Sequence, residues 1–69
     1  MFMINDRKDE YTACAYTIEE GLVNAINHCV TEGLMIVSLD RIIEDEITII
    51  YTDPDDGNNY DIAIYPIEI

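Results

Sequence analysis

The sequence predicts a two-layer α+β fold in which one helix packs on a mainly antiparallel sheet, in the order β-α-β-β-β. Three observations lead to this class. One segment has the apolar spacing of a helix, three later segments are rich in branched apolar residues, and clusters of turn-forming residues separate those three. Without repeats or a Gly/Pro/Ser-rich linker, the chain is expected to form one small acidic domain over residues 1–69.

The helix is predicted over residues 18–32. Thr17 and Glu20 form a capping-box pattern, in which the threonine hydroxyl accepts from the backbone N–H three residues later. Gly33 supplies the left-handed residue that commonly ends a helix. His28 is expected to be a solvated helix residue or a contact at the rim of an interface. The stripe expected to face the sheet contains Ile18, Leu22, Ala25, Ile26, Cys29 and Val30.

The strands are predicted from runs of branched and aromatic residues. Residues 1–9 contain few apolar anchors and are expected to form a flexible arm or a short strand. Two polar segments, 44–46 and 53–59, are expected to turn the chain between strands. The four strands themselves are expected over residues 10–16, 34–43, 47–52 and 60–67.

Both faces of the expected sheet carry apolar residues, whereas a sheet covered on one side normally alternates apolar and polar residues. Ile47 and Ile49 fall on one face of their strand, and Ile50 falls on the other. Tyr65 adds to the apolar character of the last strand. Because one helix covers one face, two explanations stay open for the second face. Either the N-terminal arm or a curled edge covers it, or it is an interface, for instance of a homodimer.

The balance of charge excludes several classes of partner. The chain has fifteen acidic and three basic side chains, and its formal net charge is -12. Direct binding to nucleic acid or to an anionic membrane needs several Lys or Arg side chains, so neither is expected. Two cysteines are too few for a small secreted disulfide scaffold, and no apolar run approaches the roughly 20 residues that span a membrane. A cytoplasmic protein is expected.

Neither catalytic residues nor a cofactor or metal site is expected. His28 and Cys29 lie about 100° apart around a helix, which separates them as a nucleophile–base pair. If Gly57 takes the glycine position of an EF-hand loop, Pro54 and Ala63 fall where oxygen ligands are required. One histidine and two cysteines do not complete a four-ligand zinc site. Weak Ca²⁺ binding by the Asp-rich turn stays open.

The acidic residues are the strongest functional signal. A body of this length is roughly 28 Å across, and that length of B-DNA carries on the order of 16 phosphates. Fifteen carboxylates therefore approach the charge density of duplex DNA, whereas a net charge of about 2–8 suffices for solubility. In size, charge and compactness the chain resembles the DNA-mimic inhibitors of bacteriophages and mobile elements, including anti-CRISPR, anti-restriction and uracil-DNA-glycosylase inhibitor proteins.

This resemblance implies a non-catalytic inhibitor that helps to evade host defence, acting in the host cytoplasm. Its partner would be a basic nucleic-acid-binding protein, whose groove the carboxylates would occupy while tyrosines anchor the contact. The alternative is a homodimeric accessory or regulatory interaction module whose acidic surface only keeps it soluble. The residues expected to contact the partner are Asp40, Glu44, Asp45, Glu46, Tyr51, Asp53, Asp55, Asp56, Tyr60, Asp61 and Tyr65.

Overall fold

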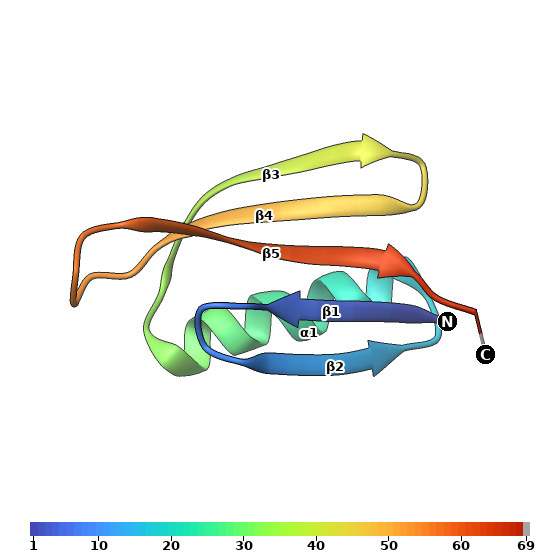
Figure 1. The fold of residues 1–69 in the computed structure, drawn as a ribbon, viewed down its shortest axis with the longest axis horizontal. Coiled ribbons are helices and arrows are strands. Elements are labelled where there is room, and N and C mark those ends of the chain that lie inside the picture. Colours follow the sequence, from blue (N-terminus) through green and yellow to red (C-terminus); the bar gives the residue numbers. More distant parts are fainter. Residues whose placement is uncertain (69) are drawn as a thin grey trace.

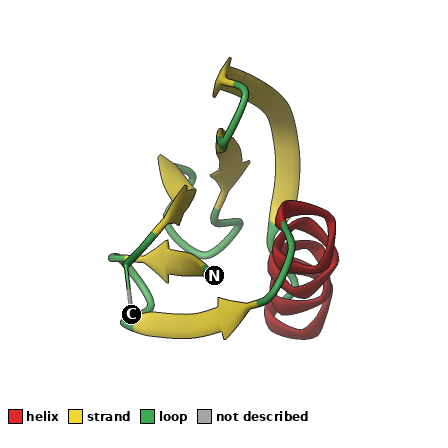
Figure 2. Cartoon of the chain, turned by 90° about the vertical axis from the view of Figure 1, so that its right-hand side faces the viewer, coloured by secondary structure: helices red, strands yellow, loops and turns green. Residues whose placement is uncertain are grey.

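The computed structural model describes residues 1–68, in which one helix packs on a five-stranded antiparallel sheet (Figure 1). The sheet order is β2-β1-β5-β4-β3. The sheet curves around the helix, which lies between the two edge strands and contacts every strand (Figure 2). The elements are β1 (Phe2–Asp6), β2 (Tyr11–Ala15), α1 (Ile18–Glu32), β3 (Met35–Ile43), β4 (Glu46–Thr52) and β5 (Asn59–Pro66).

The α+β class is confirmed, but the predicted element order is wrong, because an additional strand precedes the helix. Of the two alternatives for residues 1–9, the short strand is confirmed: Phe2–Asp6 forms β1, which pairs with β2 on one side and β5 on the other and so does not cover the second face. Ile4 and Asp6 are both fully buried in this strand. A carboxylate at an inward-facing position breaks the apolar alternation, so the sequence pattern does not distinguish this strand from a flexible arm.

The helix has its predicted bounds and both predicted caps. The backbone N–H of Glu20 donates to Thr17 Oγ1 at 3.1 Å, which satisfies a donor that the first turn leaves free. Gly33 has a φ of 70°, and the N–H of Leu34 donates to the carbonyl of Cys29 at 2.8 Å. Such a left-handed residue is the common way to satisfy the last carbonyls of a helix.

The predicted buried stripe of the helix is correct only in part. Ile18, Ala25 and Cys29 are buried as expected, but Gly21 is buried with them and Val30 is 72% exposed. A Cβ atom on Gly21 would lie 3.1 Å from Cγ2 of Ile64, so the glycine permits a close approach of the helix to β5. This approach turns the helix so that the side carrying Val30 faces away from the sheet.

The hydrophobic core lies between the helix and the central strands β1, β5 and β4. Ile49 and Tyr51 of β4 and Ile62 and Ile64 of β5 are completely buried there. Edge strand β3 contributes little, since its side chains are exposed apart from the half-buried Ser38. Its large exposed apolar residues are Met35, Ile36, Val37, Leu39, Ile42 and Ile43.

Two substitutions test the orientation of the helix. Ile18→Ala removes a buried side chain from the core and is expected to lower the free energy of unfolding by about 2–4 kcal/mol. Val30→Ala removes an exposed side chain and is expected to change it by no more than about 0.5 kcal/mol. Urea unfolding followed by circular dichroism measures both. Equal losses for the two variants would contradict this orientation.

Candidate functional site

The exposed carboxylates gather at the two ends of an elongated body that measures 36 × 19 × 17 Å. Twelve of the fifteen acidic residues are exposed. One end combines the β1–β2 turn, the β4–β5 turn and the C-terminus of α1, and the other combines the β3–β4 turn with the N-terminus of α1 (Figure 1). The first end presents Asp9, Glu10, Glu32, Asp55 and Asp56, and the second presents Glu19, Glu20, Glu44, Asp45 and the half-buried Glu46.

The sequence-predicted contact residues divide among several environments. Asp40 of edge strand β3 and Asp61 of β5 are exposed and lie between the two ends, within two register positions of each other along β4. Tyr65 is half-buried. Tyr60 is also half-buried, and its hydroxyl donates to Oδ2 of Asp56. The ends therefore hold most of the predicted acids, while these two aspartates occupy a separate position between them.

Two of the predicted contact residues are used inside the fold. Tyr51 is fully buried, and its hydroxyl donates to the carboxylate of Asp6. Asp53 is only 6% exposed, and Nζ of Lys8 lies 2.6 Å from its Oδ2. The hydrogen bond from Lys8 and a second one from the backbone N–H of Asp55 hold the pKa of Asp53 below its ordinary value. Neither side chain is free for a partner.

The centre of the buried polar network is the carboxylate of Asp6, which is completely buried between the sheet and the helix. Its Oδ1 lies 2.8 Å from the hydroxyl of Tyr51 and 3.3 Å from the backbone N of Lys8. Its Oδ2 lies 3.0 Å from Nε2 of His28. With the carboxylate as the acceptor, as it is for the Tyr51 hydroxyl, this hydrogen bond places a proton on Nε2. Burial and the bond to Asp6 raise the pKa of Tyr51.

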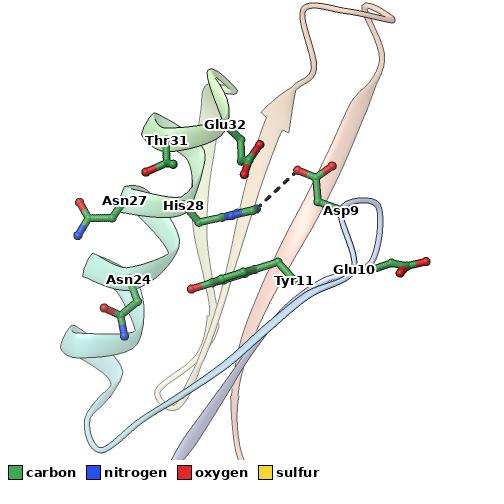
Figure 3. A pocket seen from close by; sticks show the side chains of 8 residues that line it. All are labelled: Asp9, Glu10, Tyr11, Asn24, Asn27, His28, Thr31 and Glu32. Atoms are coloured by element: carbon green, nitrogen blue, oxygen red, sulfur yellow. Dashed lines mark ion pairs between the residues drawn. The ribbon is translucent and has the colours of Figure 1, made fainter.

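His28 is held in place from two sides. Its ring stacks on the ring of Tyr11, with the centroids 4.0 Å apart and the planes within 5° of parallel. Its Nε2 also lies 3.7 Å from Oδ2 of Asp9, which the β1–β2 turn carries (Figure 3). The His28 side chain is only 7% exposed. The expectation of a solvated histidine is therefore wrong, because the β1–β2 hairpin packs over this side of the helix.

An open cleft of about 670 Å³ lies beside this network, between the β1–β2 turn and the C-terminal half of α1 (Figure 3). Tyr11 and His28 form part of its wall, and amide, hydroxyl and carboxylate groups form the rest. Its volume lies within the range of small-molecule sites, but its lining is more polar than is usual for them. The lining residues are Asp9, Glu10, Tyr11, Asn24, Asn27, His28, Thr31 and Glu32.

Sequence reasoning did not single out this site. Asp6 and Asp9 belong to a charged run that resembles an exposed arm, and Tyr11 lies in a strand without a motif. The available signal was the single histidine on a helix that also carries a buried cysteine at the next position. The thiol of Cys29 is buried, and burial raises its pKa, with the charges of Asp6 and Asp9 adding to the effect.

Comparison with known proteins assigns this chain to no family. The sequence matches no family model and no curated protein, and the fold matches no solved structure. Within residues 1–68, no helix is long and apolar enough to cross a membrane.

Removal of one hydroxyl tests the buried network. Tyr51→Phe leaves the buried Asp6 carboxylate without one donor and is expected to lower the free energy of unfolding by about 1–3 kcal/mol. Tyr60→Phe is the matched control, because it removes an exposed hydroxyl that also donates to an aspartate. The control is expected to have a much smaller effect in the same urea titration. A loss for Tyr51→Phe no greater than that of the control would contradict the network.

Proposed function

We propose that this protein is a non-catalytic inhibitor that occupies the nucleic-acid-binding surface of a basic target protein. The observation that carries the proposal is the collection of exposed carboxylates at two ends of a body 36 Å long. One turn of B-DNA is about 34–36 Å long, so the two acidic ends are separated by up to one helical turn. A protein that grips phosphates one turn apart would find carboxylates at similar positions.

The density of charge supports the same function. A stretch of B-DNA as long as this molecule carries about 21 phosphates. The chain presents twelve exposed carboxylates and one half-buried carboxylate over that length, which is more than half as many charges. Electrostatic attraction of this size speeds association with a basic surface and falls as salt screens it.

Exposed charge pairs contribute little by themselves, so the contact also needs apolar anchors. Tyr16 is the best placed, because it is 78% exposed and directly precedes the helix N-terminus with its Glu19 and Glu20. The half-buried Tyr60 lies near the opposite end, beside Asp56. Each acidic end of the molecule thus has an aromatic side chain next to it.

The test compares charge removal at one end with charge removal in the middle. The Glu44→Gln/Asp45→Asn variant neutralises two carboxylates at the β3–β4 end, and the Asp40→Asn/Asp61→Asn variant neutralises two that lie between the ends. Immobilised protein is exposed to a cell lysate, and the bound proteins are eluted with duplex DNA. We expect DNA to elute nucleic-acid-binding proteins. We expect these proteins to bind the Glu44→Gln/Asp45→Asn variant about tenfold more weakly than the unmodified protein, and the Asp40→Asn/Asp61→Asn control to lose less affinity.

Two results would overturn the proposal. In the first, proteins captured by the chain are not displaced by DNA at concentrations that saturate their nucleic-acid sites. In the second, poly-glutamate elutes them as well as DNA does at equal charge, which would show that charge alone and not its arrangement is recognised. Weaker binding at higher salt is expected for the protein itself, with a smaller salt dependence for the end variant.

A second candidate function is favoured by one observation, the exposed apolar surface of β3. We propose as the alternative that the protein is a homodimeric accessory or regulatory module, in which β3 pairs with its copy in a second chain. Contiguous apolar surface on a soluble protein commonly marks a contact, and an unprotected edge strand readily accepts another strand. A core of this size also gains stability from association.

Sedimentation tests the alternative. If β3 joins two chains, the protein sediments as a dimer whose stability does not decrease at high salt, and Ile42→Lys converts it to a monomer. Val23→Lys is the matched control, because Val23 is an apolar residue that is 56% exposed but lies on α1 and not on β3. A monomer at concentrations up to the millimolar range, or a dimer that both variants leave intact, would contradict a β3 interface.

A further inference from the structure

Three metal-ligating side chains, Asp6, Asp9 and His28, converge beside the cleft, and the last two also line it. Oδ2 of Asp6 lies 3.0 Å from Nε2 of His28, and Oδ2 of Asp9 lies 3.7 Å from the same nitrogen. All three groups offer a ligand atom within 4.8 Å of the others. Unlike the acidic residues at the surface, Asp6 and His28 are almost completely inaccessible to solvent. The cluster therefore differs from an ordinary group of solvated carboxylates.

One proton on the imidazole does not account for the arrangement. The Nε2–H group is a single donor, and its hydrogen bond at 3.0 Å goes to Asp6. The 3.7 Å separation from Asp9 is beyond hydrogen-bond length. Nζ of Lys8 is 4.0 Å from Oδ1 of Asp9 but only 2.6 Å from Asp53, so Lys8 is bound mainly to Asp53. Two carboxylates thus lie close to one nitrogen, which can donate a hydrogen bond to only one of them.

We propose that Asp6, Asp9 and His28 bind a divalent transition-metal ion such as Zn²⁺. Zinc binds nitrogen and carboxylate oxygen at about 2.0–2.2 Å, so two ligand atoms of a tetrahedral ion lie about 3.4 Å apart. The observed separations of 3.0 and 3.7 Å from Nε2 lie on either side of this value. The ion would bind the lone pair of Nε2, with the imidazole proton on Nδ1 instead, and would be coordinated by both carboxylates.

The surroundings of the three side chains are those of an outer coordination shell. Tyr51 donates to Asp6 from beneath, and the stacked ring of Tyr11 fixes the plane of His28. Such contacts orient metal ligands and are a regular part of metal sites. Asp9 and His28 also line the open cleft, from which water can supply the fourth ligand.

The ligand set identifies the class of ion. One imidazole with two carboxylates suits Zn²⁺, Mn²⁺, Fe²⁺, Co²⁺ or Ni²⁺, whereas Ca²⁺ and Mg²⁺ prefer sites made only of oxygen ligands. The proposed site is separate from the Asp-rich β4–β5 turn, where Asp53 forms an ion pair with Lys8. Asp9 also belongs to one acidic end, but Asp6 and His28 are buried away from any contact surface. The proposed site does not depend on the inhibitor function, because a Zn²⁺ titration of the protein alone involves no basic partner.

The experiment titrates the intact protein with Zn²⁺ by isothermal calorimetry and records thermal unfolding with and without the ion. We expect one ion per chain at micromolar concentrations and a higher unfolding midpoint, because the ion binds the folded state. Asp9→Asn is expected to weaken binding about tenfold or more. This variant is the decisive one, since no hydrogen bond of the fold depends on the Asp9 side chain in residues 1–68. Glu10→Gln removes the same charge from the neighbouring residue and is expected to bind like the unmodified protein.

Further variants separate the site from its alternatives. Asp55→Asn tests the Asp-rich turn and is expected to leave Zn²⁺ binding unchanged, and Ca²⁺ is expected not to compete. The proposal is overturned if no ion binds at these concentrations, in which case the His28 proton alone holds the carboxylates. It is equally overturned if several ions bind per chain, or if Asp9→Asn and Glu10→Gln have the same affinity.

Discussion

The fold depends on a carboxylate that lies where an apolar side chain would be expected. Asp6 belongs to β1, its donor Tyr51 belongs to β4, and its donor His28 belongs to α1. A buried charge is tolerated only when surrounding donors replace the water that it has lost. The helix, the N-terminal strand and the fourth strand must therefore take their native places together. The network specifies one arrangement of these elements, which an apolar core alone would specify less strictly.

The chain has fifteen acidic and only three basic residues. Two of the basic residues bind at the acidic ends of the molecule, where like charges repel one another most. Lys8 joins the β1–β2 turn to the β4–β5 turn through Asp53. Arg41 donates from its guanidinium to the backbone carbonyl of Glu44 and so braces the β3–β4 turn. Each acidic end is thus held by one basic side chain, Lys8 or Arg41, while most of the carboxylates that face solvent have no basic partner in residues 1–68.

Local patterns predicted the helix, both of its caps and the turns, because these features depend on neighbours in the sequence. Thr17 and Gly33 are recognisable from residue type alone. Strand β1 was expected only as one of two alternatives for residues 1–9. The local pattern could not decide between them, since Asp6 is acceptable inside the fold only because of Tyr51 and His28, which are distant in the sequence. The rotation of the helix likewise depends on the packing of Gly21 against Ile64. The excess of acidic residues predicted an acidic surface. The cleft was not predictable, because its walls come from the β1–β2 turn and α1, which only the tertiary structure brings together.

The sheet order has a consequence for how the chain reaches its native state. β5 comes last in the sequence, yet it lies at the centre of the sheet between β1 and β4, and Phe2 is paired with Pro66. The β1–β2 and β3–β4 hairpins can each form from nearby residues, but they join only when the final strand inserts between them. Contacts of such long sequence separation slow folding. During synthesis, the two hairpins must wait for β5 to leave the ribosome before they become one sheet.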